Sequence, residues 1–278
     1  MEFIREVLGI ISQYYSYLLS GVGYTMLIAL IGTAAGFLIG LITGVIRTAP
    51  RSKNAVVRVL HKIVNAIIAV YIEVFRGTPM MVQAMVIYWG YAFLNDGATL
   101  PLIPAGLFIV YINTGAYMAE SVRGGIISID PGQTEGAKAI GMTHVQTMLN
   151  VILPQALRNI MPQIGNNFII NVKDTSVMFI IGFPDFFSAH RAAVGASYLY
   201  FPSAAVEMIG YLTMTLIASF LLRWLEKKMD GASDYELVQE DPLVMTAGTY
   251  SHPDKGSPFD EQNREYQELK HGRNRGER

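Results

Sequence analysis

Cysteine is absent from the 278-residue sequence, which excludes disulfide bonds and thiolate metal sites. Charged residues are scarce, since they make up 15% of the chain against about 25% of an average soluble domain. They are also unevenly spread: 11 of the 22 acidic residues lie after Met229. The part of the chain before that residue is therefore far more apolar than the overall composition indicates.

Two long segments, residues 18–46 and 203–222, contain no lysine, arginine or aspartate. About 20 consecutive apolar residues are needed to cross the hydrocarbon core of a bilayer. The sequence therefore predicts an all-α integral membrane protein. Residues 1–13 lack a basic region followed by a small-residue cleavage site, so we expect no cleavable signal peptide.

Apolar segments predict about five membrane-spanning units, at residues 17–46, 54–93, 102–120, 155–181 and 201–226. The second unit is too long for one simple span. Arg76-Gly77-Thr78-Pro79 predicts a helix break inside it, because glycine and proline interrupt helices. Splitting the unit in two would give six crossings instead of five.

The charges of the loops distinguish between these counts. With five crossings, one side of the membrane has only Arg5 and Arg191, and eleven basic residues lie in or beside the loops of the other: Arg47, Arg51, Lys53, Arg58, Lys62, Arg123, Lys138, Arg158, Arg223, Lys227 and Lys228. Cytoplasmic loops are enriched in lysine and arginine, so the second side is predicted to be cytoplasmic. Six crossings would leave at least one basic group on the wrong side.

This topology divides the chain into three parts. Residues 1–16 are expected to be a short extracytoplasmic N-terminus, and residues 17–228 the transmembrane domain. Residues 229–278 are expected to be a cytoplasmic tail, and their polar composition predicts disorder because they cannot bury a core. We expect that tail to be dispensable for the function of the transmembrane domain.

Within the first span, glycines recur at every fourth position, at Gly32, Gly36, Gly40 and Gly44. Glycines at this spacing form one bare ridge on a helix, along which a second helix can approach closely. We interpret the ridge as a helix-packing surface.

The connection at residues 122–153 carries the most informative pattern. Asp130 and Pro131 are typical of a helix start, and Gly141 of a helix end. Thr143 to Gln146 forms a second capping box, whose helix is expected to end before Pro154. A short, sharply bounded helix in a loop suits docking to a soluble partner, and a solvated connector explains the pattern as well.

The residues of this loop resemble a known signature. Glu135-Gly136-Ala137, Gly141 and Val151-Ile152-Leu153-Pro154 are similar to the EAA loop, E-A-A-x3-G-x9-I-x-L-P, of permease subunits of bacterial ABC importers. Gly136 and Val151 depart from that pattern.

Three further segments, at residues 75–79, 113–125 and 173–176, look like the polar amino acid branch of these importers, which takes histidine, glutamine, glutamate, arginine or cystine. The resemblance covers residues 21–228. It implies the type I permease fold, with about five transmembrane helices and a cytoplasmic coupling-helix loop, in the plasma membrane.

The resemblance implies further expectations about partners. ATPase subunits would bind ATP and magnesium, an extracytoplasmic solute-binding protein would deliver an amino acid, and the permease would work as a homodimer or heterodimer among membrane lipids. The chain itself would need no cofactor or metal, bind no nucleic acid and be no enzyme. The coupling residues would be Glu135, Gly136, Ala137, Gly141 and Pro154.

Two charged residues are candidates for the amino acid's own charges. Ionised groups in a spanning segment are costly and usually mark a pathway. Arg76 is expected to bind the carboxylate and Asp174 the ammonium group. Thr78, Gln83, Asn113, Thr175 and Ser176 could add hydrogen bonds, and the same amides could instead bond between helices.

Two other classes of protein compete with an importer. A channel or secondary transporter has no need of a capped loop helix, and we find no inverted repeat. A membrane enzyme is disfavoured because the five histidines are scattered and no hydrolase or metalloprotease motif is present. Residues 136–143 resemble a phosphate-binding loop but carry Met142 where lysine is required.

Overall fold

The computed structural model describes residues 2–50 and 52–229, and every regular element in these ranges is helical. The tail expected at residues 229–278 lies outside the described residues apart from Met229. The elements are α1 (Glu2–Thr48), α2 (Ala55–Gly77), α3 (Met80–Leu94), α4 (Leu102–Ile127), α5 (Pro131–Ala139), α6 (His144–Thr147), a π-helix (Met148–Ile152), α7 (Leu153–Asp174), a 3-10 helix (Thr175–Ile181), α8 (Phe186–Ser197) and α9 (Tyr200–Met229).

Four of the described helices are long and apolar enough to cross a membrane: α1, α2, α4 and α9. A fifth span results if residues 144–181 are joined to α8, which is bent by 52° from them. The predicted number of about five membrane-spanning units is therefore confirmed. Side chains on the outer faces of these helices, such as Leu30, Ile67 and Phe220, are apolar and more than 60% exposed, as a lipid-covered surface requires.

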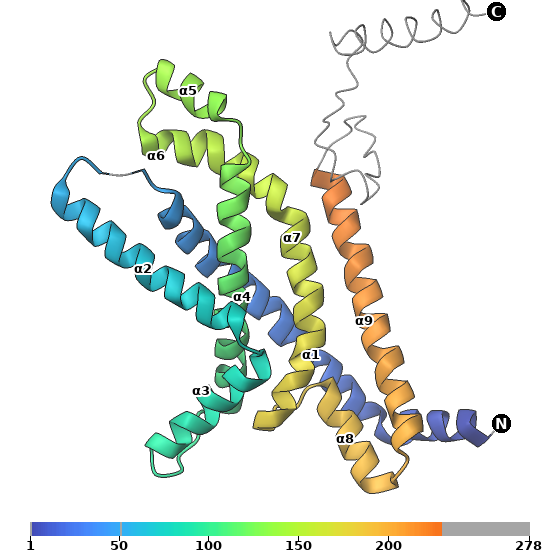
Figure 1. Ribbon diagram of the computed structural model, residues 1–278. Helices are drawn as coiled ribbons and strands as arrows, with labels where there is room; N and C mark the ends of the chain where they lie inside the picture. The colour runs from blue at the N-terminus through green and yellow to red at the C-terminus, as the bar shows by residue number, and fades with distance from the viewer. Residues whose placement is uncertain (1, 51, 230–278) are drawn as a thin grey trace, which may run out of the picture. The chain divides into compact units, whose positions relative to one another are not determined.

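The loops rich in basic residues lie together at one end of the bundle. Figure 1 shows α5, the end of α1, the start of α2 and the end of α9 at its top, with α8 and the first turns of α1 at its bottom. We refer to these as the α5 end and the α8 end.

The glycine ridge packs α1 against α4, as the sequence predicts. A Cβ atom added at Gly36 would lie 2.6 Å from the Cβ of Thr114, and one at Gly44 would lie 2.7 Å from a methyl carbon of Val122. Gly40 is tighter still, because its Cβ would meet the backbone of Met118 at 2.7 Å. Side chains of α4 thus fill the places that Cβ atoms would occupy on α1.

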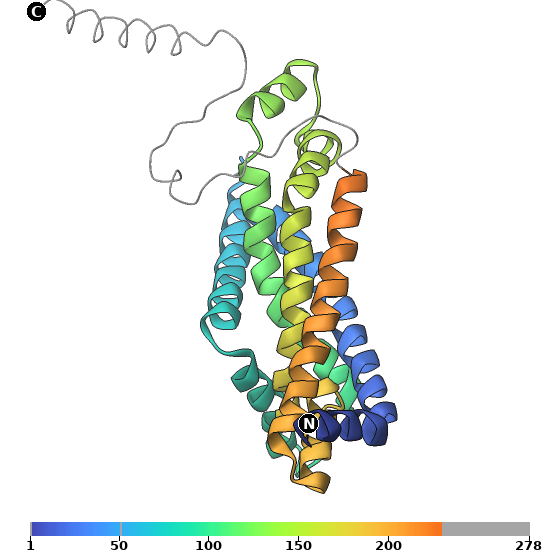
Figure 2. The same cartoon turned by 90° about the vertical axis from the view of Figure 1, so that its right-hand side faces the viewer.

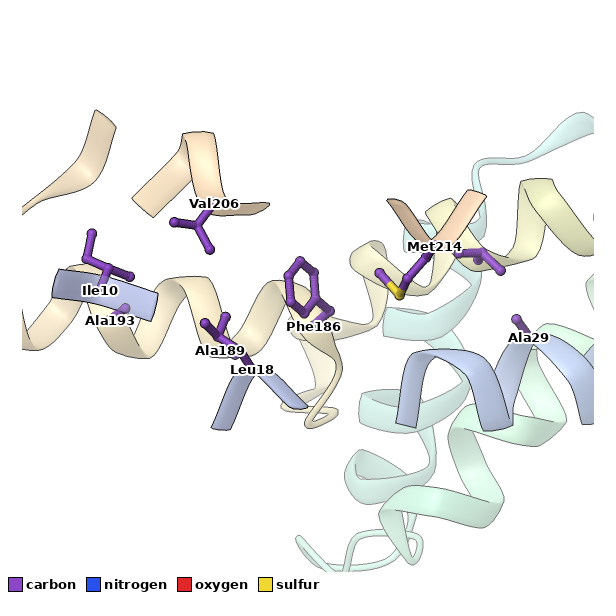
Figure 3. Close-up of a cluster of buried hydrophobic side chains, with 9 residues drawn as sticks. Ile10, Leu18, Ala29, Phe186, Ala189, Ala193, Val206 and Met214 are labelled. Carbon is purple, nitrogen blue, oxygen red and sulfur yellow. The ribbon is translucent and has the colours of Figure 1, made fainter. Parts of the chain in front are cut away.

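Helices α1, α8 and α9 share a buried apolar cluster at the α8 end. Figure 3 shows Ile10 of α1 close to Ala193 of α8 and Val206 of α9, with Phe186 further along α8. Thr25 of α1 accepts a hydrogen bond at 3.1 Å from the backbone N–H of Phe186, so the contact is polar as well as apolar.

Three boundaries differ from those that the sequence suggests. Helix α1 starts at Glu2 rather than at residue 17, because the first turns are themselves helical and pack on α8 and α9. Helix α4 continues to Ile127, past Glu120, whose charge is balanced by two arginines. The helix expected to end before Pro154 does not end there.

The chain stays helical through Pro154 because a π-turn comes first. The N–H of Leu153 donates to the carbonyl of Met148, five residues earlier, in place of the α-helical partner. Pro154 then occupies the first turn of α7, where a missing N–H is tolerated. The chain therefore runs as one helical path from His144 to Asp174.

Candidate functional site

A break in the second span organises the predicted substrate residues. Helix α2 ends at Gly77, and Thr78 is extended, with φ −123° and ψ 147°, because the next residue is Pro79. Helix α3 resumes at Met80. A helix end leaves backbone carbonyls without helical partners, which is costly inside a membrane unless side chains satisfy them.

The side chains of three predicted substrate ligands form hydrogen bonds at this break. Gln83 is buried, and its Nε2 lies 2.9 Å from the carbonyl oxygens of Phe75 and Thr78. Asn113 of α4 donates to Oε1 of Gln83 at 2.8 Å, and Thr78 Oγ1 donates to the carbonyl of Val74 at 2.7 Å. Their polar atoms therefore stabilise the broken helix, and contact with substrate stays a prediction for them.

Arg76 is in the last turn of α2 and is exposed. Its guanidinium lies 5.6 Å from the centroid of the Tyr117 ring on α4, a cation–π contact that orients the group and leaves donors available. Tyr117 is one helical turn beyond Asn113, so the break and the arginine face the same stretch of α4.

Asp174 is the last residue of α7. It is half-buried, and the 3-10 helix that follows holds Thr175, whose hydroxyl donates to the carbonyl of Val172 at 2.9 Å, and the half-buried Ser176. One turn before Asp174, Asn171 bonds Thr114 of α4 and Thr33 of α1. Asn171 therefore has the interhelical role, and Asp174 follows it at the end of α7.

Arg76 and Asp174 do not pair with each other. The salt bridges within residues 2–50 and 52–229 are Arg47–Glu120 and Arg123–Glu120, and His190 lies 3.5 Å from Glu207, a contact that is ionic only when the imidazole is protonated. Within the described residues, neither candidate side chain therefore belongs to a salt bridge.

The amide side chains along α7 lie in different surroundings. Asn167 is buried and donates to the carbonyl of Gln163 in its own helix, whereas Asn159 and Gln163 are exposed. A cavity of about 520 Å³ adjoins this helix, between α1, α7 and α9. Side chains such as Leu30, Phe168 and Leu221 line it with apolar surface, so it is no site for a charged amino acid.

Helix α5 protrudes at the α5 end as a capped, exposed element (Figure 1). Asp130 accepts from the N–H of Gly132, and the helix ends at Ala139, two residues before Gly141. Gly141 has φ +83°, the left-handed conformation that favours glycine. Both capping predictions for this loop are confirmed, including the box between Thr143 and Gln146.

The five predicted coupling residues take different positions on this loop. Glu135 and Gly136 are exposed, and a Cβ added at Gly136 would meet nothing within 4 Å. Ala137 is buried at 6% exposure, and α5 contacts the π-helix. Gly141 follows the end of α5, and Pro154 is the second residue of α7. The loop therefore has one anchored face and one free face.

Two charged clusters could not be predicted from the sequence, because their members are far apart in the chain. At the α5 end, Glu120 of α4 binds both Arg47 of α1 and Arg123, the latter at 2.9 Å. The cluster fastens the end of α1 to α4.

The second cluster joins α8 to α9 at the α8 end. Buried His190 lies 2.8 Å from Ser203 Oγ and 3.5 Å from Glu207, and buried Asp185 caps α8 at Ser188 and accepts from Tyr211. In the sequence, the acidic residue Glu207 within an otherwise apolar segment is a signal for this cluster. No group of three or more metal-ligating side chains is assembled within the described residues.

Comparison with known proteins decides the family. The family described as binding-protein-dependent transport system inner membrane component matches residues 36–231. The chain belongs to this family. Its expected place among the permeases of ABC importers is thereby confirmed, and a multi-pass protein of the plasma membrane follows.

Individual relatives agree. The glutamine transport system permease protein GlnP of Escherichia coli is 35% identical over 212 residues, 76% of this chain and 92% of that protein. A probable amino-acid ABC transporter permease, YckA of Bacillus subtilis, is 30% identical over 216 residues, 78% of this chain and 90% of that protein.

Solved structures extend the match to the fold. A crystal structure of an amino acid ABC transporter with histidines is 34% identical, with a TM-score of 0.67, over 78% of this chain and 96% of that one. An inward-facing methionine ABC transporter shares the fold at 21% identity and a TM-score of 0.61, over 76% of this chain and 94% of that one. The expected type I permease fold is confirmed.

Proposed function

We propose that this chain is the membrane-spanning permease of an ATP-driven amino acid importer and forms its translocation pathway by alternating access. The observation that carries the proposal is α5, a capped and exposed helix with the importer signature, in a chain of the importer-permease family. The names of the relatives support amino acids as the substrate class, because the glutamine permease matches over most of both chains.

Helix α5 would dock into a partner ATPase, which binds ATP and magnesium. The helical continuity from His144 to Asp174 supports a coupling route. When closure of two ATPase subunits displaces α5, its buried contact at Ala137 would move the π-helix, and α7 would follow as one body. The far end of α7 is where Asp174 lies, so nucleotide-driven motion at the loop would reach the candidate substrate site.

The substrate site would be held by two opposite charges. Arg76 presents a planar, two-pronged donor to the carboxylate, and the Tyr117 ring limits its orientations. Asp174 would accept from the ammonium group. Thr78, Gln83, Asn113, Thr175 and Ser176 surround the break and the end of α7, where their remaining hydrogen-bonding capacity could contact the substrate side chain.

The basic loops at the α5 end support a cytoplasmic position for that end, with the N-terminus outside. The α8 end would then receive the amino acid from a solute-binding protein. A second permease, either another copy of this chain or a close relative, would complete the pathway.

Co-purification tests this proposal. The chain is expressed with an affinity tag in a bacterium whose ABC ATPases can be identified by mass spectrometry, and a Gly141→Asp variant is the matched control. We expect an ABC ATPase to be retained by the unaltered chain and lost from the variant. Equal recovery of the ATPase from both chains would show that α5 is not the dock.

A further inference from the structure

The first turns of α1 run across the bundle rather than along it. In Figures 1 and 2, α4, α7 and α9 are upright, whereas the helical segment at the N-terminus lies crosswise at the α8 end before α1 turns upward. This segment, residues 2–15, is called the crosswise segment below. Its side chains fall into three stripes at helical spacing.

The first stripe faces the protein. Ile10 is 3% exposed, and Val7 and Tyr14 pack partly buried on the same cluster. Figure 3 shows Ile10 against α8 and α9, and the ring of Phe3 lies 5.4 Å from that of Phe201. The crosswise segment is therefore fixed to the α8 end and is not a free terminus.

The second stripe is apolar and uncovered. Ile4, Leu8, Ile11 and Tyr15 follow one another at four, three and four residues, and their exposures are 63, 60, 42 and 65%. Leu19, one turn further, is 67% exposed and belongs to the apolar outer surface of the spanning part of α1. The stripe thus continues the surface that α1 presents to lipid.

The third stripe is polar. Glu2, Arg5, Ser12 and Gln13 are exposed and occupy the remaining arc of the helix. An amphipathic helix with this division, lying across the ends of membrane spans, matches a helix at the boundary between headgroups and acyl chains. Exposed aromatic side chains at the same end, Tyr198, Tyr200 and Phe201, fit that depth, because tyrosine is enriched at membrane interfaces.

We propose that the crosswise segment is an interfacial helix that binds the phospholipid surface through Ile4, Leu8, Ile11 and Tyr15, with the polar stripe in water. This phospholipid surface is that of the outer leaflet, an assignment that rests on the orientation given under the proposed function. The segment would fix the depth of the α8 end, because it is packed on α8 and α9 on one side and on lipid on the other.

The absence of cysteine makes a direct test possible. Single cysteines at Leu8, Ile11, Ser12 and Gln13 are spin-labelled in the full-length protein in phospholipid nanodiscs, and their accessibility to oxygen and to a water-soluble nickel chelate is measured. A label at Leu216, an exposed apolar position on α9, gives the lipid reference, and one at Asn95 in the α3–α4 loop gives the water reference.

We expect labels at Leu8 and Ile11 to match the lipid reference, with the nickel effect at least several-fold below that of the water reference. Labels at Ser12 and Gln13 should match the water reference. Nickel access at all four positions would overturn the proposal. So would access at Leu8 and Ile11 that disappears only when a solute-binding protein is added, because the stripe would then be a protein dock.

The leaflet is tested separately with the Gln13→Cys variant in intact cells. A membrane-impermeant maleimide should label it from outside. Labelling only in inverted vesicles would refute the orientation and hence the outer leaflet, whereas the spin-label pattern alone decides whether the helix is interfacial.

Discussion

Replacing Gly40 by alanine should separate α1 from α4. The added Cβ would lie 2.7 Å from the backbone carbonyl carbon of Met118 and 2.9 Å from the backbone nitrogen of Ala119, and closer still to the Met118 Cβ. Backbone atoms cannot move aside as a flexible side chain can, so the helices must shift along their whole contact. Forcing an extra methyl group into a packed interior typically destabilises by about 1–3 kcal/mol.

The same helix supplies a matched control. Gly23 is exposed, and a Cβ there would meet nothing within 4 Å. Gly23→Ala should therefore leave the free energy of unfolding unchanged or raise it by up to about 1 kcal/mol, the helix preference of alanine over glycine. The two variants make the same chemical change, so only the contact with α4 separates them.

The assay is unfolding in mixed detergent micelles with increasing dodecyl sulfate, followed by circular dichroism and Trp fluorescence. We expect the midpoint for Gly40→Ala to fall and that for Gly23→Ala to stay or rise. Equal midpoints for the two variants would refute the close packing of α1 on α4 through the glycine ridge.

Three other predictions follow from the site. Gly136→Ala should stabilise α5 by up to about 1 kcal/mol with uptake retained, because the added Cβ meets nothing within 4 Å. Gly141→Ala should instead destabilise the loop by about 1–2 kcal/mol, because Gly141 has a left-handed φ. Hydrogen exchange of the α5 amides distinguishes the two effects. Gln83→Leu should lower the unfolding midpoint by the equivalent of about 1–3 kcal/mol by stranding carbonyls at the break, and the exposed Gln163→Leu should not. Asp174→Asn should fold normally and lose uptake in a reconstituted complex; unchanged uptake kinetics would exclude its contact with the ammonium group.

Features set by neighbouring residues could be predicted from the sequence. The break at Thr78 and Pro79, the caps at Asp130 and Thr143 and the glycine ridge each depend on a few positions in one helix or turn. Residue types and their local spacing identify these features, because steric and capping rules act within about one or two helical turns.

Features that depend on distant partners could not be predicted. The sequence left open whether Gln83 and Asn113 bind substrate or form hydrogen bonds between helices. The structure shows their hydrogen bonds at the break, which arise because the fold brings α4 beside Phe75, and contact with substrate stays a prediction for both. The contacts of Glu120 with Arg47 and of His190 with Glu207 were missed for the same reason. The continuation of the helix through Pro154 depends on a π-turn, for which the sequence carries no clear signal.

ATP-driven uptake and its loss on a change in α5 give the most direct test of the central claim. The chain, its partner ATPase and the solute-binding protein are reconstituted in vesicles, and ATP hydrolysis and uptake of labelled glutamine are measured together, for the unaltered chain and for Gly141→Asp. The account predicts uptake that requires ATP and is abolished in the variant while the spans stay inserted. Uptake without ATP, or a variant that keeps its ATPase with normal turnover and uptake, would contradict it.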